Sequence, residues 1–88
     1  MIEKLKNSDL KIAKKMHLVF QASYKVEAKI LNATNFPPLK RTLENYTESN
    51  TEFYGYSIKE VLAAVVEIDT NNNRILIRSL VVHPDFFR

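Results

Sequence analysis

The spacing of the apolar residues changes once along this chain, and that change limits the folds open to it. In the first third, one stripe of mostly apolar residues recurs at alternating steps of four and three, the period of one helix face: Ile12, Met16, Val19, Ser23, Val26 and Ile30. After Glu52 the period falls to two, as in a strand with one buried face. A helical first half and a strand-forming second half predict an α+β domain.

The first half predicts a short opening strand and two helices. Residues 1–5 alternate weakly, and Asn7-Ser8-Asp9 can cap a helix that runs from about Asp9 to Leu31, with a break near Tyr24 as an open alternative. Met16, Val19 and Phe20 are expected to face the sheet, with Lys11, Lys15 and Lys25 in solvent. Pro37-Pro38 begins a second helix that ends at residues 48–50.

The second half predicts three strands joined by tight turns. The strands are residues 53–58, 61–69 and 74–83, and the turns are Lys59-Glu60 and the asparagine-rich residues 70–73. The apolar end Leu80-Val81-Val82 predicts burial on both faces of the last strand. The expected order is β-α-α-β-β-β, with two helices packed on an antiparallel meander. The tyrosines are expected to pack with their hydroxyl groups at the surface: Tyr24, Tyr46, Tyr54 and Tyr56.

Length and composition limit the classes of protein to which this chain can belong. The 88 residues, 45% hydrophobic and 26% charged, predict one small globular domain over residues 1–88. The chain has no cysteine, and His17 and His83 are isolated, so no metal site is predicted. The net charge of +3 comes largely from helix lysines without interleaved aromatics. These lysines indicate either an ordinary solvent-exposed helix face or a surface that attracts anions. No nucleic-acid partner is expected. The chain has neither a long apolar run nor a secretory signal. We therefore expect a cytoplasmic protein that has no membrane partner.

The last ten residues carry a more specific signal. A strand containing Leu80 and Val82 in an L-x-V-x-P pattern runs into Pro84 and then Asp85-Phe86-Phe87-Arg88. With the element order, this pattern resembles the N-terminal half of a GNAT-type N-acetyltransferase, in which such a strand leads into a basic, glycine-rich turn and a helix. The resemblance covers the whole chain in element order and the last ten residues in motif.

The resemblance implies a fold, a reaction and a cofactor site. The fold is the first half of an acyl-CoA N-acyltransferase fold, and the reaction moves an acetyl group from acetyl-CoA to an amine-bearing acceptor. The backbone of Leu80, Val81 and Val82 would hold the pantetheine arm, since a strand edge carries unpaired N–H and C=O groups. Arg88 would meet a cofactor phosphate, or be a frayed terminal residue. The single glycine is Gly55, so the glycine-rich pyrophosphate turn does not occur in these residues. The isolated 88-residue chain is therefore expected to be inactive, to have no resident cofactor and to bind acetyl-CoA weakly or not at all.

Several ionisable residues are candidates for catalysis. Glu67 shares a strand face with Asp69, and a carboxylate beside an amine can act as a general base. The alternative is a strand end that emerges into solvent. His83 is either a base or an ordinary polar residue at the surface. Glu27 falls within the apolar arc of the first helix, where it either lines an acceptor pocket or shows that the helix has bent or ended.

The alternative function is a non-catalytic interaction module that uses an exposed edge strand. The strand from Arg74 to Val82 is apolar and has no lysine, features that favour pairing with another chain. We therefore expect a homo-oligomer through residues 74–82, most simply a two-fold dimer. In either case the sequence does not name the acceptor amine, whose pocket the resemblance places around Lys29 to Lys40.

Overall fold

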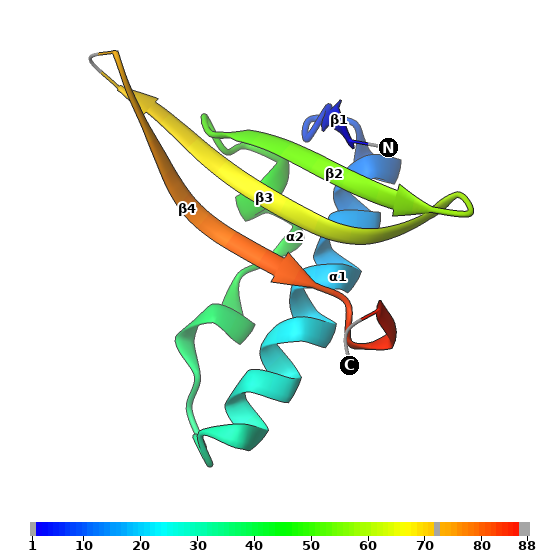
Figure 1. Ribbon diagram of the computed structural model, residues 1–88. Coiled ribbons are helices and arrows are strands. Elements are labelled where there is room, and N and C mark those ends of the chain that lie inside the picture. Colours follow the sequence, from blue (N-terminus) through cyan, green and yellow to red (C-terminus); the bar gives the residue numbers. More distant parts are fainter. Residues whose placement is uncertain (1, 72, 87–88) are drawn as a thin grey trace.

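Four antiparallel strands form one sheet that two helices cover on one side (Figure 1). The computed structural model describes residues 2–71 and 73–86 and confirms the α+β class. The elements in chain order are β1 (Ile2–Leu5), α1 (Leu10–Ile30), η1 (Pro37–Lys40), α2 (Leu43–Thr47), β2 (Glu52–Ile58), β3 (Val61–Asn71), β4 (Arg74–Val82) and η2 (Pro84–Phe86), where η is a 3-10 helix. The strands lie in the order β1-β2-β3-β4. None of the described helices has both the length and the apolar character needed to cross a membrane.

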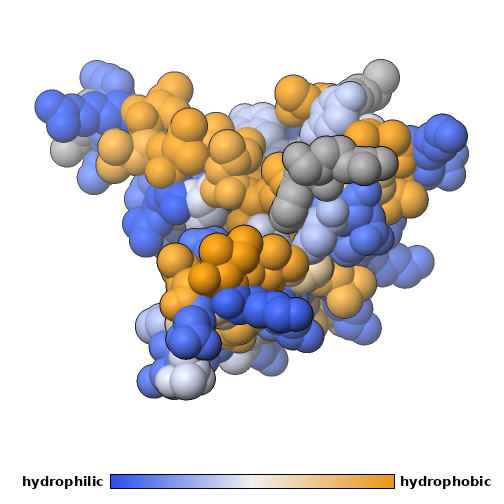
Figure 2. Space-filling view, turned by 60° about the horizontal axis from the view of Figure 1, so that its bottom comes forward, coloured by the Kyte–Doolittle hydropathy of each residue, from blue (hydrophilic) through white to orange (hydrophobic). Residues whose placement is uncertain are grey.

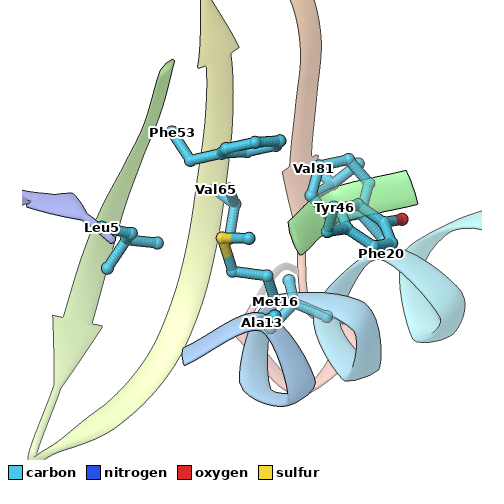
Figure 3. Packing of buried hydrophobic residues seen from close by; sticks show 9 residues of the cluster. Leu5, Ala13, Met16, Phe20, Tyr46, Phe53, Val65 and Val81 are labelled. Atoms are coloured by element: carbon cyan, nitrogen blue, oxygen red, sulfur yellow. The ribbon is translucent and has the colours of Figure 1, made fainter. Parts of the chain in front are cut away.

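Helix α1 has the predicted phase. Its N-cap is Asp9, whose carboxylate accepts a hydrogen bond from the backbone N–H of Lys11 at 2.9 Å. The buried face consists of Ala13, Met16, Val19, Phe20 and Ala28, whereas Lys11, Lys15 and Lys25 are exposed. Figure 3 shows the side chains of Ala13, Met16 and Phe20 pointing from α1 toward the strands. The prediction of which face packs on the sheet is confirmed.

The final turns of α1 explain the unusual position of Glu27. The helix continues unbroken through Tyr24 to Ile30, so both a break at Tyr24 and an end before Glu27 are wrong. Glu27 is exposed, and Ile30 is exposed over 77% of its surface. The last part of α1 extends past the strands, as Figure 1 shows, so its apolar arc has little to pack against there. A charged residue in that arc therefore carries no burial cost.

The predicted second helix is two short helices. η1 ends at Lys40 and α2 begins at Leu43, with Arg41 and Thr42 extended between them. Thr42 starts the new helix through a capping box with Asn45, which satisfies the first N–H groups of α2. The break leaves Arg41 free to turn toward the sheet.

Tyr46 occupies the centre of the core. Its side chain is fully buried, and its ring centroid lies 5.0 Å from that of Phe20 and 6.1 Å from that of Phe53. The hydroxyl is buried too, and it has no hydrogen-bond partner among the described residues. The expectation that this hydroxyl reaches the surface is wrong, because the whole side chain lies inside the core, against the rings of Phe20 and Phe53.

The two predicted turns have the geometry that hairpins need. Lys59 and Glu60 both have positive φ, 51° and 68°, as a tight two-residue turn of the I′ kind requires. Asn73 at the next turn has a φ of 66°, which asparagine tolerates better than most residues. β2, β3 and β4 therefore form the predicted meander.

One face of β4 is exposed, contrary to the prediction of burial on both faces. Val81 points toward α1 and is 3% exposed, whereas the neighbouring Leu80 points to the other side and is 68% exposed. Side chains alternate along a strand, and within the described residues helices cover one face of the sheet. The apolar run Leu80-Val81-Val82 thus spans a buried and an exposed face.

Candidate functional site

The free edge of β4 carries the backbone groups expected of a cofactor site. β4 is the last strand of the sheet within residues 2–71 and 73–86. The N–H of His83 donates to the carbonyl of Ala63 at 2.8 Å, and hydrogen-bonded pairs alternate along an antiparallel ladder. Val81, opposite Val65, therefore pairs with β3, whereas Leu80 and Val82 direct their N–H and C=O groups away from it.

This alternation refines the predicted cofactor residues. Leu80 and Val82 present backbone groups at the edge, but the backbone of Val81 is engaged with β3 and its side chain lies in the core. Arg88, the predicted phosphate contact, lies outside the described residues. The backbone site that the structure offers is thus Leu80 with Val82.

A bulge divides the edge of β4 into two parts. Glu67 pairs with Ser79 and Ile68 pairs with Ile77, so Arg78 is an extra residue on β4. Bulges at sheet edges bend the strand and redirect its groups. We call residues 79–82 the core segment, because they pack over α1, and residues 74–77 the arm segment. The core segment contains both candidate backbone sites.

Glu67 lies beneath the sheet at the centre of a hydrogen-bond network. Its carboxylate forms a two-pronged ion pair with Arg41, with N–O distances of 2.8 and 3.0 Å. The hydroxyl of Thr51 donates at 2.7 Å and that of Ser79 at 3.1 Å. The carboxylate accepts four hydrogen bonds in all, while the residue is only 3% exposed. A buried charge needs such compensation.

The electrostatics of this network favour the charged forms of both partners. Burial raises the pKa of Glu67, but the hydrogen bonds from Arg41 and Thr51, the charge of Arg41 and the hydrogen bond from Ser79 together lower it below its ordinary value. Burial lowers the pKa of Arg41, and the hydrogen bond and charge of Glu67 raise it above its ordinary value. The guanidinium also lies 4.3 Å from the ring centroid of Tyr46, a cation–π contact. Burial raises the pKa of the Tyr46 phenol, which is therefore neutral.

These surroundings bear on the predicted role of Glu67 as a general base. A carboxylate with a lowered pKa and four hydrogen-bond donors is a weak proton acceptor. The geometry therefore favours a structural role, joining the η1–α2 connection to β3 and β4. Its catalytic role stays a prediction.

Sequence reasoning missed the partners of Glu67. The available signal was the series Ala63, Val65 and Glu67 at steps of two, which places a carboxylate on the buried face of the strand, where it requires a partner. The break between η1 and α2 that brings Arg41 to it has no comparable signature in the sequence.

The ion pair predicts a dependence of stability on pH. Because the pKa of Glu67 in the folded chain is below the ordinary value of 4.5, the unfolded chain binds the proton first as the pH falls. The stabilisation is therefore fully present above that value and is lost as the pH falls through the folded pKa. We expect Glu67→Gln to be less stable than the parent chain at neutral pH, with a difference that shrinks in acid. Urea unfolding of both chains across a pH series measures this difference in stability. A difference independent of pH would contradict this account.

The other candidates lie apart from Glu67. Asp69 forms an exposed ion pair with Arg78, with an N–O distance of 3.3 Å. The Nδ1 atom of His83 accepts a hydrogen bond from the N–H of Asp85 at 3.1 Å, just past the core segment. Beside His83 is an open groove between α1 and the β2–β3 turn, lined by Lys15, Leu18, Val19, Glu60, Val61 and Leu62. Within the described part of the chain, no group of three His, Cys, Asp or Glu residues can hold a metal ion.

Comparisons with known proteins give one relative. The chain is 32% identical over all of its 88 residues to the UPF0157 protein YqkA of Bacillus subtilis (strain 168), and it spans 26% of that protein's length. No family model matches the chain. No solved structure matches it significantly.

Proposed function

We propose that the chain is the N-terminal portion of an acetyl-CoA-dependent N-acetyltransferase, in which the core segment of β4 holds the pantetheine arm. The observation that carries the proposal is the outward direction of the N–H and C=O groups of Leu80 and Val82 at a free edge, just before His83-Pro84. The element order β-α-α-β-β-β supports the same assignment to the first half of an acyl-CoA N-acyltransferase fold. Both features belong to the resemblance noted in the sequence.

The chemistry of the edge fits this ligand. The pantetheine arm of acetyl-CoA is a linear chain with secondary amides, and amides pair with the N–H and C=O groups of an edge strand. The exposed side chain of Leu80 offers an apolar contact to the methylene groups of the arm. An outward N–H that points at the acetyl carbonyl would also stabilise the negative charge that develops there during attack.

The proposed reaction is attack of a neutral amine on the thioester of acetyl-CoA. The amine nitrogen forms a bond to the acetyl carbon, and the carbon–sulfur bond breaks, so that coenzyme A leaves as a thiolate with the electron pair of that bond. The amine gives up a proton. Glu67 is the proton acceptor predicted from the sequence. Because its carboxylate is engaged with Arg41, an acceptor elsewhere fits the geometry better. The acceptor substrate is assigned only as an amine.

A titration tests the proposed edge site. We expect acetyl-CoA to bind the 88-residue chain more weakly than micromolar, because two edge residues supply few of the polar contacts that a complete cofactor site makes. Leu80→Pro should weaken binding further, since proline removes an outward N–H that β3 does not use. Ile75→Pro is the matched control on the arm segment and should leave binding unchanged. Calorimetry measures all three chains.

Two outcomes would contradict the proposal. Micromolar binding by the parent chain would mean that other residues supply the site, and equal binding by both proline variants and the parent would place acetyl-CoA away from the core segment. The alternative function, a non-catalytic interaction module, is favoured by the exposed apolar side chains of Ile75 and Ile77, and it predicts no specific effect of acetyl-CoA.

A further inference from the structure

The tip of the β3–β4 hairpin forms an arm with apolar side chains on both faces. β2 begins at Glu52, which pairs with Ile68, so the hairpin beyond this point has no neighbouring strand in the described chain. We call residues 68–71 of β3 and the arm segment of β4 the arm. Figure 1 shows it extending beyond β2. Ile75, Leu76 and Ile77 are 72%, 56% and 67% exposed, and Figure 2 shows hydrophobic residues next to the polar tip.

The backbone of the arm segment is also directed outward. The connection between β3 and β4 is two residues long, and the closing pair of such a hairpin, here Asn71 with Arg74, is hydrogen-bonded. By alternation Leu76 pairs with Asp69, whereas Ile75 and Ile77 direct their N–H and C=O groups to the free edge. Unpaired groups of this kind are complementary to another strand.

The usual protections against pairing are weak along this segment. Lysine, proline or an inward-pointing charge commonly blocks an edge strand, and residues 75–77 contain none of these. The adjacent charge on Arg78 is compensated by its ion pair with Asp69 on the same arm. The arm segment can therefore accept a strand without leaving an isolated charge.

We propose that the arm segment pairs with the arm segment of a second copy of this chain, antiparallel and about a two-fold axis at Leu76. In this register Ile75 faces Ile77 of the second copy across hydrogen-bonded positions, and the two Leu76 side chains face each other. All three facing pairs are apolar. This register also places Arg74 opposite Arg78 of the second copy, but the charge of Arg78 is already compensated by its ion pair with Asp69. An axis at Arg74 or Arg78 would instead place two arginines at the centre of the contact.

The bulge keeps this contact separate from the proposed cofactor site. The groups of Leu80 and Val82 lie on the other side of Arg78, in the core segment. The second copy and acetyl-CoA therefore occupy different parts of the β4 edge and bind without competition. A contact of so few residues is small by the standard of stable interfaces, so the dimer is a weak one.

Sedimentation of the 88-residue chain tests the proposal. We expect a monomer of 10.2 kDa at micromolar concentration and a growing dimer fraction toward millimolar concentration. Ile77→Lys should abolish the dimer by placing a charge at the contact. Leu80→Lys is the matched control, because Leu80 is also a large apolar residue of similar exposure but lies in the core segment. This variant should leave the dimer intact. A chain that stays monomeric throughout, or equal loss in both variants, would overturn the proposal.

A cross-linking experiment tests the register directly. The chain has no cysteine, so Leu76→Cys introduces a single thiol on the proposed axis. Facing residues at a non-hydrogen-bonded antiparallel position are close enough for a disulfide. Mild oxidation should convert Leu76→Cys to a covalent dimer much faster than it converts Leu80→Cys. Equal rates would contradict the assigned register even if a dimer forms.

Discussion

Phe20→Ala is expected to remove about 3–5 kcal/mol from the free energy of unfolding, which is most of the stability of so small a domain. Phe20 is fully buried between α1 and the sheet, with the rings of Tyr46 and Phe53 around it (Figure 3). Truncation leaves a cavity that these rigid rings cannot fill. Urea unfolding followed by circular dichroism measures the loss.

The matched control for Phe20 lies on the same helix. Leu18 is a large apolar residue of α1 that is 69% exposed, so Leu18→Ala should change stability by no more than about 0.5 kcal/mol. Equal losses in the two variants would mean that the assigned face of α1 is wrong.

Arg41→Ala is expected to cost about 3–5 kcal/mol, because it leaves the buried carboxylate of Glu67 without its positive partner. The cation–π contact with Tyr46 is lost as well. The remaining donors, Thr51 and Ser79, are neutral and compensate the charge only in part. Urea unfolding at neutral pH gives the change.

Two further variants separate the ion pair from other effects of the mutation. Arg78→Ala breaks the exposed pair with Asp69 and should cost no more than about 1 kcal/mol. Replacing Arg41 and Glu67 together by methionine should restore much of the stability that Arg41→Ala loses, since no unpaired charge then remains. Similar losses for Arg41→Ala and Arg78→Ala would show that burial does not strengthen the first pair.

Local patterns in the sequence predicted the elements and the phase of α1. The period of the apolar residues placed Met16 and Phe20 in the core, and the hairpin turns followed from residues that accept positive φ, such as Asn73. These features depend on neighbours within a few positions along the chain. They can therefore be predicted from a single sequence.

Long-range packing determined what the sequence could not predict. The period of two shows that Leu80 and Val81 face opposite ways, but not that one of those faces lacks a helix in the described chain. The break that brings Arg41 to Glu67 also depends on contacts between distant segments. The bulge at Arg78 divides an edge that the pattern presents as one continuous strand.

The central claim is that the core segment of β4 holds acetyl-CoA through the backbone of Leu80 and Val82, and amide chemical shifts measured by NMR test it most directly. In a titration of the isotope-labelled chain with acetyl-CoA, the amides of Leu80 and Val82 should shift in proportion to bound ligand. Those of Ile75 and Ile77 should not move. Shifts centred on the arm segment, or no shifts at millimolar ligand, would contradict the claim.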